Sequence, residues 1–326
     1  MTSRALLFIV ALGASMPALA QTPVVKLTAA DKVDTTILSP RGDRIAAVVG
    51  KDRVAVWTLP NGGLLQELKL SRRPISLLFV EPNQIILALA DGAIEVRSLA
   101  TGALVRSMDA GGAQSVLAGS ADGRLLASSG AERIRLWDSS GTLLHTFGHE
   151  FGGVATLAFS PDAMLLASAG FDTQVHLWDV STGQQKLSVP DRLVATFAVT
   201  FTADGKQLVI GGANGAIEIL DVQTGSTVRR LRAEKYAVGN VSLSPDGRSI
   251  GAAYFDVNGM TLPAPLAVAE LASGKVVRRL MPGALPIWSG FSNDGRLLYA
   301  IAKEQELTLW ALSVASSSSS EPAKRK

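Results

Sequence analysis

The stretch from Ser160 to Val180 reads SPDAMLLASAGFDTQVHLWDV, and it decides the fold. It begins with a tight turn and continues with two short runs, Leu165–Gly170 and Val175–Val180. Similar runs, Val154–Ser160 and Gln185–Val189, lie on either side. Runs this short, punctuated so closely by turn residues, predict β-strands rather than helices. The stretch is therefore expected to form the centre of a unit of four short antiparallel strands.

The tight turn of this stretch recurs along the chain. Its third residue falls at positions 42, 83, 123, 163, 205, 247 and 295, so the interval is 40 to 42 residues until the last one, which is 48. A second turn keeps step with it, with glycines at positions 62, 102, 141, 183, 225 and 274. Glycine tolerates the positive φ that such turns need. Four strands in each of seven units predict an all-β fold, a seven-bladed β-propeller of four-stranded antiparallel blades.

The last unit supplies only three strand-like runs. The segment Val24–Thr28 precedes the first full unit and has no other place in the repeat pattern. We expect it to pair as the outer strand of the last blade, because this pairing closes the ring and removes an exposed sheet edge.

Four of the five tryptophans fall in one column when the third strands of the units are aligned. They are Trp57, Trp137, Trp178 and Trp310. An indole buries roughly 150–250 Å². The column is therefore predicted to pack between blades rather than to take part in catalysis.

At these tryptophans the chain resembles the WD-repeat (beta-transducin-like) family of propellers, in an exported bacterial form. Trp137-Asp138 and Trp178-Asp179 carry the dipeptide that gives the family its name, and the resemblance covers about residues 24–314. In the family, a His, a Ser, an Asp and a Trp form a buried hydrogen-bonded tetrad that ties together the strands of one blade. The resemblance implies this structural role for His149, Ser168, Asp172 and Trp178.

The two ends of the chain differ from the repeats. Residues 1–20 carry the charge of Arg4, an apolar run, Ala5–Leu12, and a site of small residues that ends at Ala20, as a signal peptide does. We expect cleavage near Ala20 and a periplasmic or secreted mature protein. Residues 21–314 are expected to form the propeller, and the Ser-rich, basic residues 315–326 to form a disordered tail.

Composition excludes several kinds of site. The chain has no cysteine, so it can hold no disulfide, thiol nucleophile or iron–sulfur cluster, and its three histidines do not favour a histidine metal site. The net charge of +3 comes largely from the two ends, which leaves no basic stripe for nucleic acid. No stretch after the N-terminal run is apolar enough to span a membrane. We expect no cofactor, no metal and no nucleic-acid partner.

The sixth unit is six residues longer than its neighbours, because its interval is 48 rather than 42. The additional residues fall in Phe255–Pro265, which is expected to be an enlarged loop between the second and third strands. In the family, such loops share a face with the connections between blades, one of which holds an arginine pair. A candidate partner face follows, made of Arg72, Arg73, Phe255, Met260 and Leu262. Two simpler interpretations remain open. The enlarged loop can be a hairpin that packs on its own blade, and Arg72 and Arg73 can be surface residues that only contact water.

The favoured function is that of a monomeric, exported propeller that acts as a protein-interaction scaffold in the cell envelope. No catalytic residue is predicted. The alternative is a small-molecule-binding or lyase/hydrolase propeller with its site at the central channel. The inner strands, such as Ser76–Phe79 and Val116–Gly119, offer few carboxylates or imidazoles, which general acid–base chemistry needs.

Overall fold

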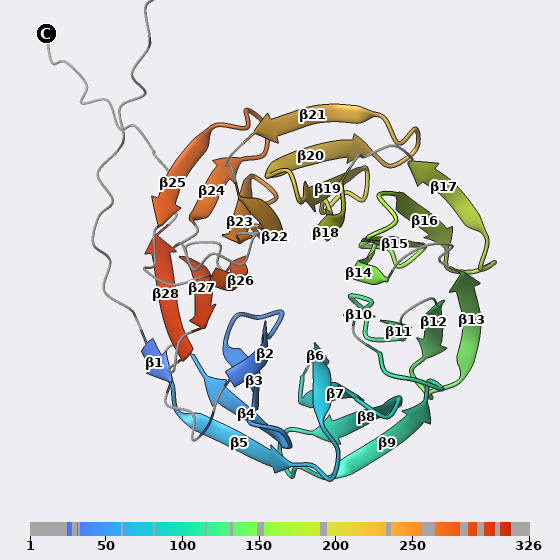
Figure 1. Ribbon diagram of the computed structural model, residues 1–326, viewed down its shortest axis with the longest axis vertical. Helices are drawn as coiled ribbons and strands as arrows, with labels where there is room; N and C mark the ends of the chain where they lie inside the picture. The colour runs from blue at the N-terminus through green and yellow to red at the C-terminus, as the bar shows by residue number, and fades with distance from the viewer. Residues whose placement is uncertain are drawn as a thin grey trace, which may run out of the picture.

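The computed structural model shows a ring of β-sheets around a central axis (Figure 1). It describes residues 25–27, 31, 33–59, 61–80, 82–114, 116–130, 133–148, 153–189, 194–232, 236–255, 265–280, 286–291, 297–303 and 307–313. These residues form 28 strands, and no helix occurs among them. None of them could therefore cross a bilayer as a helix.

The strands form seven four-stranded sheets, which we call blades 1 to 7 in chain order. Blade 1 comprises β2 (Val33–Leu38), β3 (Arg44–Val49), β4 (Arg53–Thr58) and β5 (Leu64–Lys69). Blade 2 comprises β6 (Pro74–Val80), β7 (Gln84–Leu89), β8 (Ala93–Ser98) and β9 (Leu104–Asp109). Blade 3 comprises β10 (Val116–Gly119), β11 (Leu125–Ser129), β12 (Arg133–Asp138) and β13 (Leu143–Gly148).

The remaining blades repeat this plan. Blade 4 comprises β14 (Val154–Phe159), β15 (Leu165–Gly170), β16 (Val175–Asp179) and β17 (Gln185–Val189). Blade 5 comprises β18 (Thr196–Phe201), β19 (Gln207–Gly212), β20 (Ala216–Asp221) and β21 (Thr227–Arg232). Blade 6 comprises β22 (Ala237–Leu243), β23 (Ser249–Phe255), β24 (Leu266–Glu270) and β25 (Val276–Leu280). Blade 7 comprises β26 (Pro286–Phe291), β27 (Leu297–Lys303), β28 (Leu307–Ser313) and β1 (Val25–Leu27).

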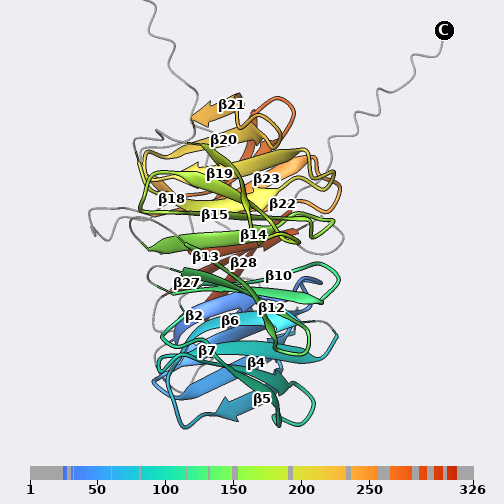
Figure 2. The same ribbon diagram turned by 90° about the vertical axis from the view of Figure 1, so that its right-hand side faces the viewer.

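The first and last parts of the described chain meet in blade 7. Strand β1 pairs with β28 in antiparallel fashion, with Val25 opposite Leu309. The inner strands of neighbouring blades contact one another around the axis, and β26 of blade 7 contacts β2 of blade 1. The ring is thereby closed, and Figure 2 shows it from the side. Every paired strand in a blade is antiparallel, so the prediction of an all-β propeller with four-stranded antiparallel blades is confirmed.

The turn between the first and second strands is built in the same way in several blades. In blade 4, the Ser160 hydroxyl donates to Asp162 Oδ1 at 2.6 Å and accepts from the amide of Leu165 at 2.9 Å. The same pattern links Ser120 with Asp122, Thr202 with Asp204 and Ser244 with Asp246. The third residue of the turn has a positive φ. Most blades place glycine there, and blade 4 places Ala163, with a φ of 57°.

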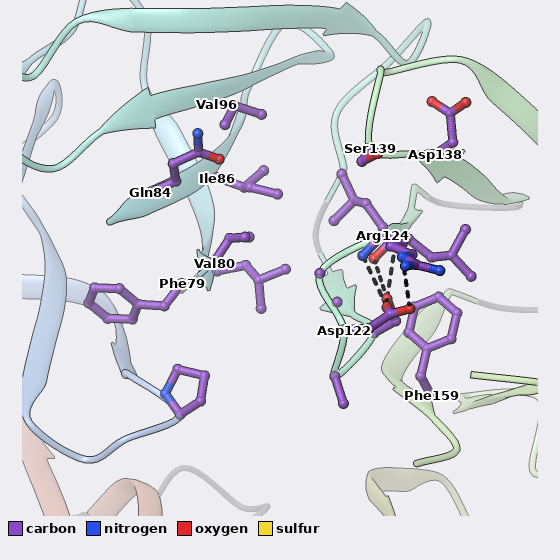
Figure 3. A pocket seen from close by; sticks show the side chains of 18 of the residues that line it. Phe79, Val80, Gln84, Ile86, Val96, Asp122, Arg124, Asp138, Ser139 and Phe159 are labelled. Atoms are coloured by element: carbon purple, nitrogen blue, oxygen red, sulfur yellow. Dashed lines mark hydrogen bonds and ion pairs between the residues drawn. The ribbon is translucent and has the colours of Figure 1, made fainter. Parts of the chain in front are cut away.

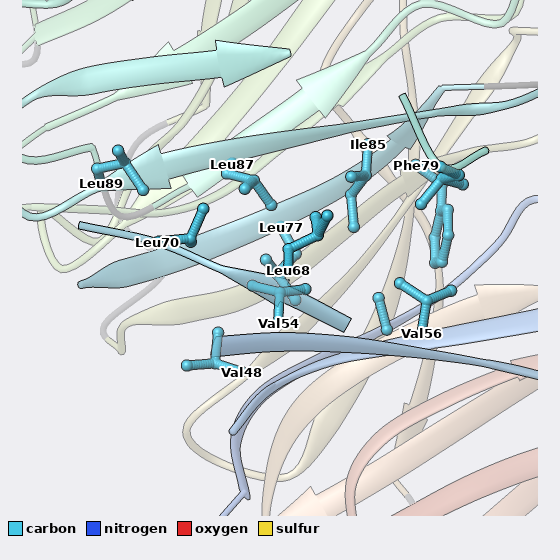
Figure 4. Close-up of a cluster of buried hydrophobic side chains, with 12 residues drawn as sticks. Val48, Val54, Val56, Leu68, Leu70, Leu77, Phe79, Ile85, Leu87 and Leu89 are labelled. Carbon is cyan, nitrogen blue, oxygen red and sulfur yellow. The ribbon is translucent and has the colours of Figure 1, made fainter. Parts of the chain in front are cut away.

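The hydrophobic core lies between blades. Figure 4 shows the junction of blades 1 and 2, where Val54 and Leu68 of one blade pack against Leu77 and Ile85 of the next. Because both faces of a blade are covered by its neighbours, strands such as β7 are apolar on nearly every residue.

Several expectations fall on parts of the chain that the structure does not describe. They are the signal peptide, the C-terminal tail, and most of the enlarged loop of the sixth unit, from residue 256 to residue 264. The loop joins β23 to β24, which are the second and third strands of blade 6.

Candidate functional site

The antiparallel blades give the ring two different faces. One face carries the links between consecutive blades and the loops from second to third strand, such as Arg72 and Phe171; we call it the connection face. The opposite face carries the turns from first to second and from third to fourth strand, such as Asp162 and Gly183; we call it the turn face.

Three phenylalanines from three successive blades form a row on the connection face. The ring centroids of Phe171 and Phe197 lie 5.6 Å apart at an interplanar angle of 72°. Those of Phe197 and Phe255 lie 5.4 Å apart at 63°. Both pairs have the edge-to-face geometry that aromatic quadrupoles favour. Phe171 is 59% exposed, so the row, hereafter the aromatic row, presents apolar surface to solvent at one end.

The strand ends position these rings. Phe171 directly follows β15, Phe197 lies near the start of the inner strand β18, and Phe255 ends β23. The ring of Phe255 lies over Gly239, because a Cβ built there would be 2.8 Å from a ring carbon. Gly239 therefore leaves the space in which the ring of Phe255 sits against the inner strand.

The described residues of the predicted partner face, Arg72, Arg73 and Phe255, lie in two different parts of the ring. Arg72 lies between β5 and β6 and forms an ion pair with Asp91, with Nε 2.8 Å from Oδ2. The carbonyl of Arg73 accepts a hydrogen bond from the amide of Ala90. Phe255 lies on the same face in blade 6, three blades from this pair around the ring. Met260 and Leu262 lie outside the described residues.

Part of the implied tetrad can be followed in blade 4. Trp178 Nε1 donates to Ser168 Oγ at 2.9 Å, and both groups are buried. Asp172 Oδ2 lies 2.9 Å from His176 Nε2, a partner on β16 that the sequence analysis did not assign. His149 lies outside the described residues, so the four-residue network stays a prediction.

The aligned tryptophans are buried where the structure describes their side chains. Trp137 clusters with Ile86, Val96 and Met108 of blade 2, and its Nε1 donates to Ser128 Oγ at 3.0 Å. The ring of Trp178 lies 5.1 Å from that of Phe147 in blade 3. Trp57 is also buried, whereas the side chain of Trp310 is not described.

The acidic groups of the turn face have structural partners. A hydrogen bond from Ser160 is the main cause that lowers the pKa of Asp162, and Ser120 does the same for the pKa of Asp122. The pKa of Asp179 is also lowered, chiefly by the Ser181 hydroxyl. No group of three or more His, Cys, Asp or Glu residues gathers within the described ranges. These carboxylates accept hydrogen bonds within their own turns and thereby stabilise them.

A groove opens on the turn face between blades 2 and 3 and continues toward the axis, where Pro40, Pro161 and Phe201 of other blades also line it; the whole space has a volume of about 720 Å³. Figure 3 shows its two walls: Val80, Ile86 and Val96 on one side, and Arg124 with Ser139 on the other. The dashed lines in the figure mark the contacts of Asp122 with the turn around it. The groove is a second candidate site.

Phe255 could be singled out from the sequence, whereas Phe171, Phe197 and the groove could not be recognised from the repeat pattern. Phe171 and Phe197 stand near strand ends on the connection face, so a search for aromatics at strand ends would find them. The groove has a weaker signal: the interval between Gly102 and Gly141 is 39 residues, shorter than that between any other two successive glycines of the second turn.

Comparisons with known proteins agree with the fold. Residues 141–179 match the family model described as "WD domain, G-beta repeat". The WD repeat-containing protein SL1-17 of Schistosoma mansoni is 35% identical over 136 residues, 41% of this chain and 45% of that protein. The WD repeat-containing protein WDS homolog of Arabidopsis thaliana is 30% identical over 132 residues, 39% of this chain and 25% of that protein.

This chain thus spans less than half the length of these curated relatives. Both relatives are eukaryotic, so they do not support the expectation of an exported bacterial type. A chain of the "Crystal Structure of Mitotic Checkpoint Complex" has a TM-score of 0.78 and 20% identity, and the match covers 93% of this chain and 99% of that one. At this identity the likeness shows the fold alone. The matched repeat, the relatives and the ring of blades together support a WD-repeat propeller.

Proposed function

We propose that this propeller is a protein-interaction scaffold that binds a partner protein on its connection face, at the aromatic row. The observation that carries the proposal is the exposure of Phe171 at the end of a row that runs over three blades. Aromatic side chains are enriched at protein interfaces because they bury a large area at a low entropic cost. Each ring of the row packs against the next.

The Arg72–Asp91 ion pair on the connection face is the kind of polar group that surrounds the apolar centre of a protein interface. The Arg72–Asp91 ion pair is about half exposed on both sides, and it lies away from the aromatic row. An exposed pair of this kind contributes little to affinity but can direct the orientation of a partner. Arg72 and Arg73 are therefore proposed as secondary contacts, and Phe255 as part of the primary one.

Site-specific photo-crosslinking in the native host tests this proposal. A benzoylphenylalanine at position 171 is expected to crosslink to a partner protein. The matched control is the same group at position 164, because Met164 is an exposed apolar residue of the same blade on the turn face. A Phe197→Ala change should weaken crosslinking from position 171. Equal crosslinking from positions 171 and 164, or no effect of Phe197→Ala, would contradict the proposal.

We also propose that residues 1–20 direct the chain to the cell envelope, as a charged and apolar N-terminal segment does. Fractionation of cells that express the chain with and without residues 1–20 tests this separately. Retention of both forms in the same compartment would contradict export and leave the binding proposal intact.

A further inference from the structure

The turns from third to fourth strand share one feature in blades 1, 2, 4, 5 and 6. Each places an apolar residue just after the third strand, and the amide of that residue donates to a carbonyl in the neighbouring turn of the same blade, at 2.7–3.0 Å. These apolar residues are Leu59, Leu99, Val180, Val222 and Leu271. The bond fixes the residue over the gap between its blade and the preceding one.

The apolar residue fills that gap. Leu99 is 2% exposed and belongs to the cluster between blades 1 and 2, together with Leu68 and Phe79. Val180 packs against the cluster between blades 3 and 4. The same position in the next two junctions is taken by Val222 and Leu271.

Blade 3 lacks this residue because its turn is one residue shorter. The amide of Gly141 donates to the carbonyl of Asp138, three residues back, whereas the amide of Gly183 donates to Asp179, four residues back. Ser139 stands where the other turns place Leu or Val, and it is exposed. Among the described residues, no backbone hydrogen bond joins it to the neighbouring turn, and no turn residue enters the cluster between blades 2 and 3.

The groove between blades 2 and 3 lies where the missing residue would be. It reaches from Ser139 and Val105 at the rim to the ends of the inner strands near the axis, where Leu78, Phe159 and Phe201 line it. A cavity of about 680 Å³ also lies between blades 4 and 5. That cavity is lined by Val222 itself and by no inner-strand residue of the described chain, so it does not extend to the axis as the groove does.

A hydrogen-bond acceptor is missing at the same place. Arg106 on β9 holds the position that Arg229 holds on β21, since each lies opposite the middle of its third strand. Arg229 Nη1 donates to the carbonyl of Leu271 at 2.6 Å, across the junction of blades 5 and 6. Arg106 lines the groove, and its buried Nε has no hydrogen-bond partner within the described part of the chain. A buried donor without a partner is costly, so an acceptor in the groove would be stabilised.

We infer that this groove binds a polypeptide segment of a partner protein. The segment supplies an aliphatic side chain in the place of Leu99 or Val180, and its peptide carbonyl accepts a hydrogen bond from Arg106. The groove lies on the turn face, so this site is independent of the aromatic row. The neighbouring carboxylates of Asp122 and Asp138 accept hydrogen bonds within their own turns through Oδ1.

The test compares the full chain with a variant in which the groove is filled. The variant replaces Ser139-Ser140-Gly141 by Val-Ser-Thr-Gly, the turn sequence of residues 180–183. The probe is a displayed library of random twelve-residue peptides. Peptides selected on the full chain are expected to share an aliphatic residue and to lose at least about tenfold in affinity for the filled variant, which is about 1.4 kcal/mol.

Two measurements separate loss of binding from loss of folding. The filled variant should melt at or above the temperature of the unchanged chain, because it restores a turn that five other blades use. In an otherwise unchanged chain, Arg106→Gln should weaken the selected peptides by about three- to tenfold while the melting temperature stays within a few degrees. The inference is overturned if no selected peptide distinguishes the filled variant, or if Arg106→Gln leaves every affinity unchanged.

Discussion

The junction of blades 1 and 2 and the junction of blades 2 and 3 are built from equivalent strands in the same order. On the turn face, however, a buried side chain fills the first junction, and a groove opens at the second. At the first, Leu99 is buried in one cluster with Leu68 and Phe79, and Figure 4 shows those two side chains at the junction. At the second, Ser139 leaves a groove beside Val80 and Ile86 (Figure 3). The two junctions differ in one turn residue, which is buried in the first and absent from the second.

Emptying the filled junction should have the largest effect. Leu99→Ala removes a fully buried side chain and leaves a cavity, so the free energy of unfolding should fall by about 2–4 kcal/mol. Denaturant unfolding measures the change. Ser139→Ala is the matched control at the open junction, where a change within about 0.5 kcal/mol is expected. Similar losses from both substitutions would show that the two junctions do not differ in packing.

Filling the open junction should stabilise the ring. The Val-Ser-Thr-Gly turn in blade 3 buries one valine side chain, and the free energy of unfolding should rise by about 1–2 kcal/mol. The same sequence is already present in blade 4, so the graft introduces no new turn geometry. A fall in stability on grafting would mean that blade 3 cannot accept the longer turn.

Two substitutions in opposite directions, Ala163→Gly and Gly123→Ala, compare the cost of a positive φ in the turns of blades 4 and 3. Ala163 has a φ of 57° in the turn of blade 4, and Gly123 has a φ of 70° beside the groove. Ala163→Gly should stabilise by about 0.5–1 kcal/mol, and Gly123→Ala should destabilise by about 1 kcal/mol, because a Cβ disfavours this conformation. Thermal and denaturant unfolding of both variants measure these changes. The same sign for both would contradict the assignment of strain to these positions.

The smallest expected effect is a dependence on acid. The pKa values of Asp122 and Asp162 are lowered in the folded chain, chiefly by hydrogen bonds from Ser120 and Ser160. An unfolded aspartate titrates near pH 4. The stabilisation from these groups is therefore present above about pH 4 and is lost as the pH falls further, through the folded pKa values.

Melting temperatures between pH 6 and pH 3 measure this dependence. The melting temperature should be nearly constant down to about pH 4 and then fall. Asp162→Asn should make the fall shallower, since it removes one of the titrating groups. The equivalent carboxylate beside the groove, Asp122, remains. A steeper fall in the variant would show that Asp162 does not contribute in this direction.

The fold could be predicted from the sequence because it is periodic. Tight turns about every 40 residues, with a second set of glycines at nearly the same spacing, indicate four-stranded units. Because neighbouring units bury each other's apolar faces, the hydrophobic core follows from the same repeat. Val24–Thr28 could be assigned to the last blade only by elimination, and the structure pairs Val25 with Leu309.

The candidate sites were harder to predict, for physical reasons. Phe171, Phe197 and Phe255 belong to three units, and their contact depends on the curvature of the ring, which no single unit encodes. The groove lies at a turn of blade 3 that is one residue shorter than in other blades. Its signal in the sequence is the 39-residue interval between Gly102 and Gly141. Arg72 and Phe255 lie on one face of the ring, but only the closed ring shows that they stand three blades apart.

The pairing of β1 with β28 has a consequence for the order of events during synthesis. Val25 leaves the ribosome long before Leu309, its partner, is made. At about 5–20 residues per second, the intervening chain takes roughly 15–60 s to appear. Through that time, the blades made first lack their final neighbour, and strand β1 has no ladder to join. Closure therefore cannot precede the synthesis of β28, and until then the edge of the first blades has no partner strand.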